Sequence, residues 1–571
     1  MDIPLGLKIV NMVYKITTSR QNELPEYFGN YIPDFITASK HKDLKLTKKH
    51  ELNNKYIDDF IDKLKKDTRI NLSGIGIMHR GKLVREEYVY PYASDYRHVS
   101  FSMCKSIVSM AVGIAIEKKL IRLEERLVDI FPEFDTVFVK KGIKNITIRN
   151  LLTMTTGAYF DELLAFFSEN WLVSYFNSDV MFEPDSEFSY NSLNTYILVA
   201  VIRKRTGMSL EEFIDKQIFN YLNITDITWD LSPEGMEQGG WGVKISIPDM
   251  LKLGQLYLNK GCVEHNGKIF NIISPKWIEE STRIHVKLDD KDVVAGYGYH
   301  IWILQDGAYL FNGLFGQNVY VNPAKELVIA ITASAYEVFP GGSLVSRLCE
   351  FASTDILYDT SFITCIKNLL KKPGYEIIKR EKIKYDSDTF FNVISEYIDV
   401  EYVFEEYAAS ILPISIQGLY SMFSSGIRKI QFKRQDDRLC MLINENNCQY
   451  EVNLGYLDNA YEYQVINIKG KNMPIAAYAS LAFDEDDNFL LKIYIDYLEE
   501  VGKRILKIYF KKDCLILKAT ETPDLQEFTG MLFGESKIRR TKKLKKLNTP
   551  DYMEYKINKI LAPVSKGISA Q

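Results

Sequence analysis

The chain has 571 residues, which is too long for one compact core, so we expect two or three domains. Hydrophobic residues make up 46% and charged residues 26%, which is typical of a soluble globular protein and excludes wholesale disorder. The net charge of −4 gives no reason to expect nucleic acid or an anionic membrane as a partner. A local exception runs from Lys537 to Lys546, and we interpret it as a solvated tail, with an RNA or membrane contact as the alternative.

The seven cysteines are odd in number, and no two have the C-x-x-C spacing of zinc or redox sites. We therefore expect free thiols in a reducing compartment. The first residues lack the pattern of a secretory signal, and no uncharged apolar run is long enough to cross a bilayer. These features predict a cytoplasmic protein without a membrane span, a metal or a cofactor.

In chain order, residues 1–50 are polar and mixed, and we interpret them as an N-terminal extension. Apolar residues at helical spacing over residues 51–66 predict a helix packed on one face. The Arg80-Gly81 pair between two apolar runs indicates a β-hairpin. Residues 102–117 are almost wholly apolar, so we expect a helix that is buried on all sides.

Apolar segments separated by turn signals predict an antiparallel meander at residues 297–304, 309–311, 319–321 and 327–332. Strands at both ends with helices between them predict an α+β domain over residues 51–355, in which the two ends share one sheet. Beyond it we predict a helical linker region at 356–410, then a β-rich C-terminal domain at 411–535, forming a small barrel or a sandwich, and a basic tail at 536–571.

The tetrad Ser102-Met103-Cys104-Lys105 has S-x-x-K spacing, as does Ser39-Lys40-His41-Lys42 in a polar stretch. Residues three apart share a helix face, so the Lys105 amine can lie beside the Ser102 hydroxyl. Burial and the positive end of the helix dipole both disfavour the ammonium form, so Lys105 could take the serine proton during attack on an acyl carbon. The alternative interpretation is a serine N-cap with a lysine in the first turn.

Two later segments could complete such a site. In Phe188-Ser189-Tyr190-Asn191-Ser192, the tyrosine hydroxyl could relay a proton, although a half-buried aromatic is the alternative. In Asn312-Gly313-Leu314-Phe315-Gly316-Gln317, the glycines let a strand approach a substrate and a backbone N–H can face an oxyanion. A bulge between two strands is the alternative for the second segment.

In this order, the three segments resemble the penicillin-recognising serine hydrolases, which are class C β-lactamases, D-Ala-D-Ala peptidases and related esterases and amidases. The resemblance covers about residues 50–355 and is strengthened by residues 148–157, 182–186, 239–242 and 249–254. Its nearest branch is that of the 6-aminohexanoate-dimer hydrolases and carboxylesterases. The resemblance implies a β-lactamase-like transpeptidase domain, with an antiparallel sheet flanked by helices and an all-helical lobe.

The resemblance also implies roles: Ser102 is the acylated nucleophile, Lys105 its base and Tyr190 the proton shuttle. The backbone N–H groups of Ser102 and Gln317 would form the oxyanion hole, and substrate would contact Ser192, Gly313, Leu314, Phe315 and Gly316. The family's Lys-Thr-Gly is here Leu314-Phe315-Gly316, which offers neither a cation nor a hydroxyl to a substrate carboxylate. A lost charge-assisted contact costs about 1.5–3 kcal/mol, so we expect β-lactams to bind poorly.

We therefore predict a serine hydrolase that cleaves a small amide or ester through an acyl-enzyme on Ser102. The chain has no G-x-S-x-G, phosphate-loop, G-x-G-x-x-G or H-E-x-x-H motif, and its seven histidines form no ligand-spaced pair. The alternatives are a non-catalytic descendant that binds a ligand and, less favoured, a β-lactamase or D-Ala-D-Ala peptidase. The aromatic-rich residues 161–179 would form either a wall of the site or part of the core.

Overall fold

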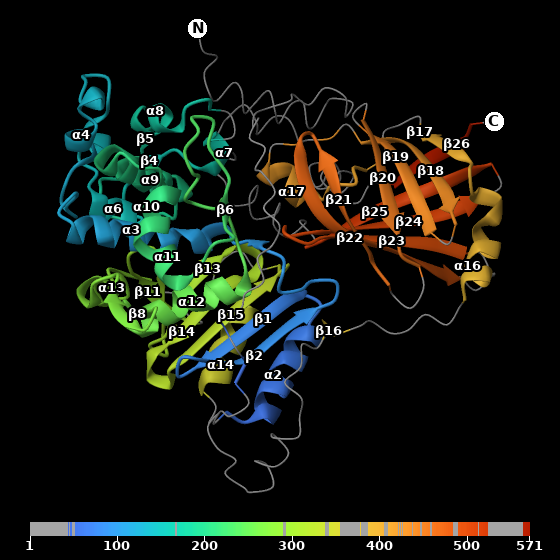
Figure 1. Ribbon diagram of the computed structural model, residues 1–571. Coiled ribbons are helices and arrows are strands. Elements are labelled where there is room, and N and C mark those ends of the chain that lie inside the picture. Colours follow the sequence, from blue (N-terminus) through green and yellow to red (C-terminus); the bar gives the residue numbers. More distant parts are fainter. Residues whose placement is uncertain are drawn as a thin grey trace, which may run out of the picture. The chain divides into compact units, whose positions relative to one another are not determined.

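The computed structural model describes residues 44, 46–47, 52–165, 168–288, 293–336, 342–353, 377–378, 386–404, 409–523 and 564–570, without 421, 423, 425, 437, 446–447, 457–459, 484–488 and 512. The tetrad at Ser39 and the basic run at Lys537–Lys546 lie outside these residues. No helix in the described part is long and apolar enough to cross a membrane. The chain divides between Ile377 and Ile378 into two compact units, which are described separately (Figure 1).

The N-terminal unit is built on a nine-stranded sheet whose paired neighbours from β10 to β2 are antiparallel. In spatial order its strands are β10 (Val286–Lys287), β11 (Val294–Tyr297), β12 (Trp302–Leu304), β13 (Tyr309–Gly313), β14 (Gln317–Asn322), β15 (Leu327–Ala333), β1 (Leu72–His79), β2 (Lys82–Val89) and β16 (Ile377–Ile378). Because β1 pairs with β15, the two ends of this unit share one sheet, as predicted.

Both faces of the sheet are covered by helices (Figure 1). On one face, α2 (Asn54–Lys66) and α14 (Ser343–Ser353) form one apolar cluster with inward residues of β1 and β15, and the Phe60 and Phe351 rings stack at 4.3 Å. On the other face lies α12 (Ile247–Leu258). A Cβ at Gly76 would lie 2.7 Å from Leu251, so the glycine lets α12 approach the sheet closely.

The remaining helices and short strands form a lobe around one buried helix. They are β3 (His98–Val99), η2 (Phe101–Met103), α3 (Cys104–Glu117), α4 (Leu127–Ile130), η3 (Pro132–Phe134), α5 (Lys141–Lys144), α6 (Ile148–Thr153), β4 (Ala158–Tyr159), α7 (Glu162–Ala165), α8 (Trp171–Phe176), β5 (Asp179–Val180), α9 (Ser192–Thr206), α10 (Leu210–Ile214), the π-helical η4 (Asp215–Phe219), α11 (Asn220–Leu222), β6 (Thr228–Trp229), β7 (Val243–Ile245), β8 (Cys262–His265), β9 (Lys268–Asn271) and α13 (Pro275–Ser281). Every residue of α3 from Cys104 to Ala115 is buried, as its apolar sequence predicts.

Two sequence-based expectations for this unit need correction. The strand predicted over residues 297–304 is split into β11 and β12, because the chain turns at Gly298–Ile301, where His300 has a φ of 59° and its N–H bonds to Leu152 O. Ser102 does not open the α-helix. It lies in the 3₁₀ turn η2, which leads directly into α3.

The C-terminal unit is a ten-stranded sheet that is almost closed into a barrel. In spatial order its strands are β20 (Cys448–Leu454), β19 (Arg438–Glu445), β18 (Ile427–Gln435), β17 (Glu401–Phe404), β26 (Val564–Ser569), β25 (Cys514–Thr522), β24 (Lys503–Lys511), β23 (Phe489–Tyr497), β22 (Lys471–Phe483) and β21 (Glu462–Ile468). The two edges meet where the Gln464 side chain donates to Asn453 O at 2.8 Å and accepts from Asn453 N at 3.0 Å.

In residues 356–410, which were predicted as a helical linker region, the described elements are the helical α16 (Ser387–Ile394) and η7 (Ser395–Tyr397) and the strands β16 and β17. The predicted basic tail likewise contains a strand, β26, which pairs with both β17 and β25. A further short helix, α17 (Ile414–Leu419), follows β17. The barrel is thus completed by a segment that the sequence pattern did not reveal.

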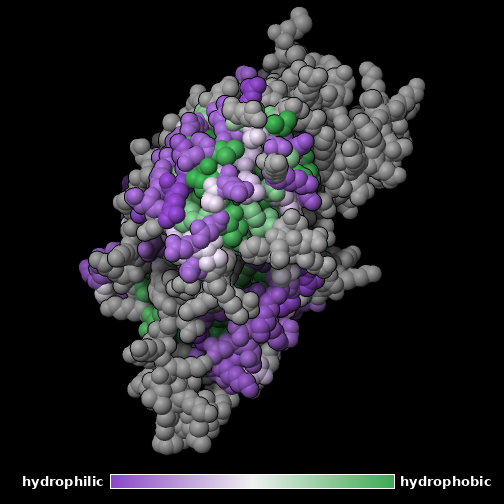
Figure 2. All heavy atoms as spheres, turned by 90° about the vertical axis from the view of Figure 1, so that its right-hand side faces the viewer, coloured by the Kyte–Doolittle hydropathy of each residue, from purple (hydrophilic) through white to green (hydrophobic). Residues whose placement is uncertain are grey.

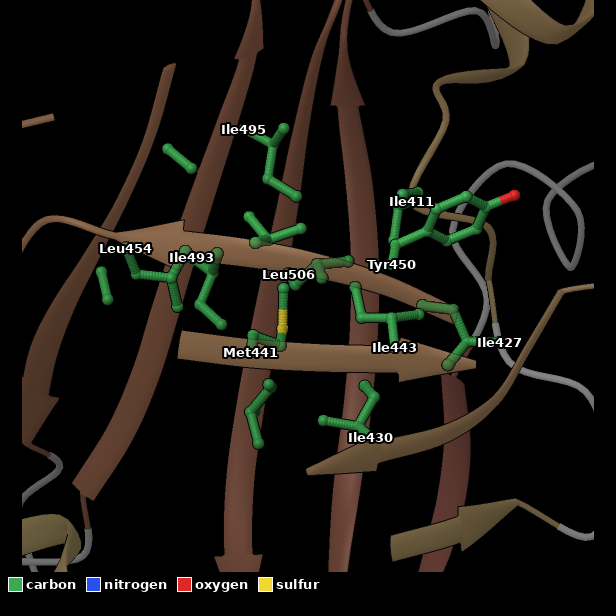
Figure 3. Packing of buried hydrophobic residues seen from close by; sticks show 14 of the residues in the cluster. Ile411, Ile427, Ile430, Met441, Ile443, Tyr450, Leu454, Ile493, Ile495 and Leu506 are labelled. Carbon is green, nitrogen blue, oxygen red and sulfur yellow. The ribbon is translucent and has the colours of Figure 1, made fainter. Parts of the chain in front are cut away.

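Aliphatic side chains from many strands point into the barrel and pack against one another (Figure 3). Ile493 and Ile495 of β23 are fully buried, whereas Lys492 and Tyr494, which alternate with them along the strand, are half-buried. Hydrophilic residues cover most of the coloured surface in Figure 2, with smaller hydrophobic areas between them. The alternation of buried and half-buried residues along β23 is the period-two pattern from which the barrel was predicted.

Ile493→Ala removes buried methyl groups from this core, and we expect the free energy of unfolding of the C-terminal unit to fall by about 2–5 kcal/mol. A denaturant titration of the full chain, followed by circular dichroism, should show an earlier transition. Lys492→Ala, on the outer face of the same strand, should change the midpoint little. Equal shifts for the two variants would contradict the barrel register.

Candidate active site

The nucleophile candidate lies in a turn whose backbone is unusual. Ser102 is half-buried in η2, directly after Phe101, which has a φ of 47°. Phe315, in the turn between β13 and β14, also has a positive φ, of 61°, and the two phenyl rings meet edge to face at 5.6 Å. Left-handed backbone is costly for a phenylalanine and persists only where the surrounding structure holds it in place. The two turns therefore fix each other beside Ser102.

The Lys105 amine lies among three oxygen atoms, two of which come from distant parts of the chain. Its Nζ is 2.8 Å from Ser102 Oγ, 2.9 Å from Ser192 Oγ and 2.6 Å from the Gly240 carbonyl oxygen. The side chain itself is only 1% exposed. The S-x-x-K spacing thus brings amine and hydroxyl into hydrogen-bond contact, as expected, and the N-cap interpretation of Ser102 does not apply, because Ser102 makes no cap.

Burial lowers the pKa of Lys105 to about 8, while the nearby thiol of Cys104 and carboxylate of Glu162 act in the opposite direction. A neutral amine has two hydrogens and one lone pair. Since Ser192 Oγ and Gly240 O can accept the two hydrogens, the lone pair is left to face Ser102 Oγ. The amine is therefore placed to accept the serine proton when it is deprotonated.

Tyr190 is the third polar side chain next to Ser102 and Lys105. Its hydroxyl is hydrogen-bonded to Ser102, and its ring centroid lies 5.0 Å from Lys105 Nζ. Burial raises its pKa well above the usual value, so the phenol stays protonated at neutral pH. The ring stacks on Trp302 with centroids 5.8 Å apart, which fixes its orientation.

The first residue of α9 and the Gly239–Gly240 pair provide the other two hydrogen-bond partners of the Lys105 amine. Asn191 is the N-cap of α9 and anchors the preceding loop by donating to Phe160 O at 2.8 Å. This places Ser192 beside Lys105. A Cβ at Gly240 would lie 2.7 Å from Ser192 O, so only glycine lets its carbonyl reach the amine without displacing α9.

The predicted oxyanion segment packs against the nucleophile turn. A Cβ at Gly313 would lie 2.0 Å from the Ser100 carbonyl oxygen, so the two backbones are in direct contact. The Gln317 side chain is fully buried and donates to Leu314 O, Phe315 O and Ala333 O, which ties the turn containing Gly316 to β15. All the predicted substrate-contacting residues thus come from the two segments next to Ser102.

Two residues at the site were not predicted from the sequence. Gly240 was noticed only as part of a family-like segment, and nothing singled out Glu162, whose Oε1 accepts from Ser192 N at 3.1 Å. In the segment predicted as a wall or core, Trp171, Tyr175 and Phe176 are buried and belong to the core. Phe166 and Phe167 lie outside the described residues.

Other reactive groups near the site are held in inert states. Cys104 donates to Gly239 O at 2.8 Å, and burial raises its pKa to about 12. His300 is buried and is hydrogen-bonded to Thr195 at 3.1 Å. Burial lowers its pKa well below the usual value, and the nearby charge of Lys105 lowers it further. Within the described residues, no group of three or more His, Cys, Asp or Glu could hold a metal ion.

Comparison with known proteins identifies the family. Residues 57–340 match the family model Beta-lactamase. Penicillin-binding protein 4* of Bacillus subtilis (strain 168) is 20% identical in an alignment 385 residues long, which covers 59% of this chain and 78% of that protein. Among solved structures, a Bacillus anthracis protein classed as a 6-aminohexanoate-dimer hydrolase is 22% identical with a TM-score of 0.43, covering 51% of this chain and 80% of that one.

A second solved structure, the octameric penicillin-binding protein homologue from Pyrococcus abyssi, is 16% identical with a TM-score of 0.41, and the match covers 82% of this chain and 98% of that one. The matched region of this chain, residues 57–340, belongs to the serine β-lactamase-related family. This family of serine hydrolases includes esterases, amidases and penicillin-binding proteins. The resemblance stated from the sequence and the predicted fold class are confirmed.

Gly313→Ala should separate the β13–β14 turn from the nucleophile turn, because the added Cβ would collide with a backbone oxygen. A displacement of about 1 Å can lower the rate of a positioned reaction by about 100-fold. We therefore expect Ser102 to react with a fluorophosphonate probe about 100-fold more slowly, with an unchanged circular dichroism spectrum. A labelling rate equal to that of the wild type would contradict this contact.

Proposed function

We propose that the chain is a serine hydrolase that cleaves a small ester or amide through an acyl-enzyme on Ser102. The observation that supports this most is the position of Lys105 Nζ, 2.8 Å from Ser102 Oγ, with acceptors for both hydrogens of the neutral amine. A base needs hydrogen-bond contact with the proton that it removes and a pKa near the working pH, and Lys105 meets both conditions.

In the proposed acylation step, Lys105 Nζ takes the Ser102 proton while Oγ attacks the substrate carbonyl carbon. The carbonyl oxygen gains the negative charge, which the backbone N–H groups of Ser102 and Gln317 would stabilise. The tetrahedral intermediate then expels the alcohol or amine. The leaving group receives the proton of the Tyr190 hydroxyl, and Tyr190 is reprotonated by the Lys105 ammonium.

Deacylation uses the same groups with water in place of serine. Water attacks the acyl carbon, its proton passes to Lys105, and Ser102 Oγ leaves with a proton returned through Tyr190. The pKa shifts of the two residues are opposite in sign, since burial lowers that of Lys105 and raises that of Tyr190. Opposite shifts of this kind support the proposed roles of lysine as the base and the phenol as the proton donor.

The substrate is proposed to be something other than a β-lactam. The family's Lys-Thr-Gly position is occupied by Leu314-Phe315-Gly316, and Phe315 is buried against Phe101. Neither side chain can bind a substrate carboxylate by a charge-assisted hydrogen bond. The non-catalytic alternative is disfavoured by the retained contacts among Ser102, Lys105 and Tyr190, for which a binding module has no need.

Ser102→Ala should abolish labelling by a fluorophosphonate probe and reduce turnover of p-nitrophenyl esters to the uncatalysed background. Ser39→Ala is the matched control, because Ser39 belongs to the second S-x-x-K tetrad, and it should behave as the wild type. An alanine variant at Ser102 that keeps full activity would rule out the mechanism. Inertness of the wild type toward esters and amides, together with tight ligand binding, would favour the binding module.

The pH dependence of kcat/KM tests whether Lys105 is the base. Only the neutral amine can accept the serine proton, so kcat/KM for a neutral ester should rise with pH, with a midpoint near the Lys105 pKa of about 8, and level off above it. Lys105→Arg should stay inactive up to pH 10, because a guanidinium remains charged. Lys118→Gln, at the exposed end of the same helix, should keep the wild-type midpoint. A flat profile between pH 6 and pH 10 would contradict lysine as the base.

A further inference from the structure

A histidine occupies a backbone position that favours glycine. His300 lies in the turn between β11 and β12 and has a φ of 59°. In this left-handed region glycine has no steric cost, whereas a residue with a Cβ does. The side chain is only 2% exposed, so solvation of the ring does not compensate for the strained backbone. This combination indicates that the imidazole makes a contact that glycine could not make.

His300 is hydrogen-bonded to three helices of the lobe. Ser106 Oγ of α3 donates to His300 O at 2.9 Å, and His300 N donates to Leu152 O of α6 at 3.1 Å. The ring reaches α9, where its Nε2 lies 3.1 Å from Thr195 Oγ1. The two backbone bonds are available to any residue at this position, but the contact with α9 depends on the side chain. The imidazole therefore connects α9 to a turn that is itself bonded to α3.

The two connected helices carry the groups that the Lys105 amine contacts. Ser106 directly follows Lys105 in α3, and Thr195 lies three positions after Ser192 in α9, which is about one helical turn. Lys105 Nζ is 2.8 Å from Ser102 Oγ and 2.9 Å from Ser192 Oγ. The spacing between α3 and α9 therefore decides whether the amine can contact both hydroxyls at once.

The imidazole lies near the amine without adding a charge. Burial lowers the pKa of His300 well below its usual value, and the charge of Lys105 lowers it further, so the ring stays neutral. Its partners on α6 and α9, a leucine carbonyl and a threonine hydroxyl, do not titrate. The other ionisable groups around the ring and the amine are Cys104 of α3, Glu162 of α7, Tyr190 before α9, and Arg149 of α6 with its hydrogen-bond partner Tyr299. A buried neutral ring fills space that water would otherwise enter, and burial is the main cause of the low pKa of Lys105.

We infer that His300 is a positioning residue, which holds α9 against α3 through Thr195 so that the Lys105 amine contacts Ser102 and Ser192 together and stays out of water. This inference rests on the proposed function, since it assigns a further role in the same reaction. In this role the imidazole transfers no proton. Its effect reaches the reaction through the position and the hydration of Lys105.

His300→Gly suits the backbone conformation and removes the ring, so it separates the role of the side chain from that of the turn. Water that enters the space would stabilise the ammonium form of Lys105. The midpoint of the pH profile of kcat/KM for a neutral p-nitrophenyl ester should therefore rise from about 8 by about one pH unit. The plateau at high pH should fall by about 10- to 100-fold, because the amine is less well placed.

Conservative variants test the contact with α9. The glutamine amide reaches as far as Nε2, so His300→Gln should keep a midpoint close to that of the wild type. Asparagine tolerates the positive φ but is too short to reach Thr195, so His300→Asn should resemble the glycine variant. Thr195→Val removes the hydroxyl and should shift the midpoint upward by a smaller amount, with no further shift when it is combined with His300→Gly. His265→Gly removes a half-buried histidine that is hydrogen-bonded to Tyr221 O, and it should keep the wild-type midpoint.

Thermal unfolding of each variant is followed alongside the pH profile, because a residue that only stabilises the fold would change the melting temperature and leave the midpoint near 8. A midpoint that neither His300→Gly nor Thr195→Val moves would overturn the inference, while turnover by the wild type would still support the proposed hydrolase. Absence of wild-type turnover for every ester, together with no fluorophosphonate labelling of Ser102, would instead overturn the proposed function.

Discussion

The structure around the candidate site depends on a single buried amine. Lys105 is excluded from water, and three oxygens from η2, from the start of α9 and from the Gly239–Gly240 turn surround its Nζ. A buried ammonium would be costly, so the surroundings must either pair it or let it lose its proton. Among the residues that the structure describes, hydrogen-bond acceptors surround it and no carboxylate contacts it directly. Burial lowers the pKa of Lys105 to about 8, and the acceptors on Ser192 and Gly240 leave the lone pair of the neutral amine facing Ser102.

Keeping that amine buried requires close approaches between backbones that only particular residues permit. Gly240 lies against the first turn of α9, and Gly313 lies against the strand end that leads to Ser102. The positive φ angles of Phe101 and Phe315 are held by the contact between their rings. Such strain persists only where the surrounding packing over-determines it, and here the packing belongs to the helices and sheet on either side of the site.

Local patterns predicted much of the fold. The spacing of apolar residues predicted the buried helix that forms from Cys104 to Glu117, the amphipathic α2 and the alternating strands of the barrel. The errors occur where a long-range contact overrides the local pattern. His300 breaks a predicted strand because its N–H bonds to Leu152, and β26 joins the barrel only because β17 and β25 leave a gap that it fills.

For the site, the sequence by itself determined the pairing of Ser102 with Lys105, since residues three apart share one face of a helical turn. The order of its segments also carried the resemblance from which Tyr190 and Gln317 were predicted as site residues. Only the tertiary structure decided that Gly240 accepts from the lysine and that Glu162 adds a negative charge beside it. These contacts join residues that are 135 and 30 positions apart, and no local periodicity records which distant side chains the packed elements will bring together.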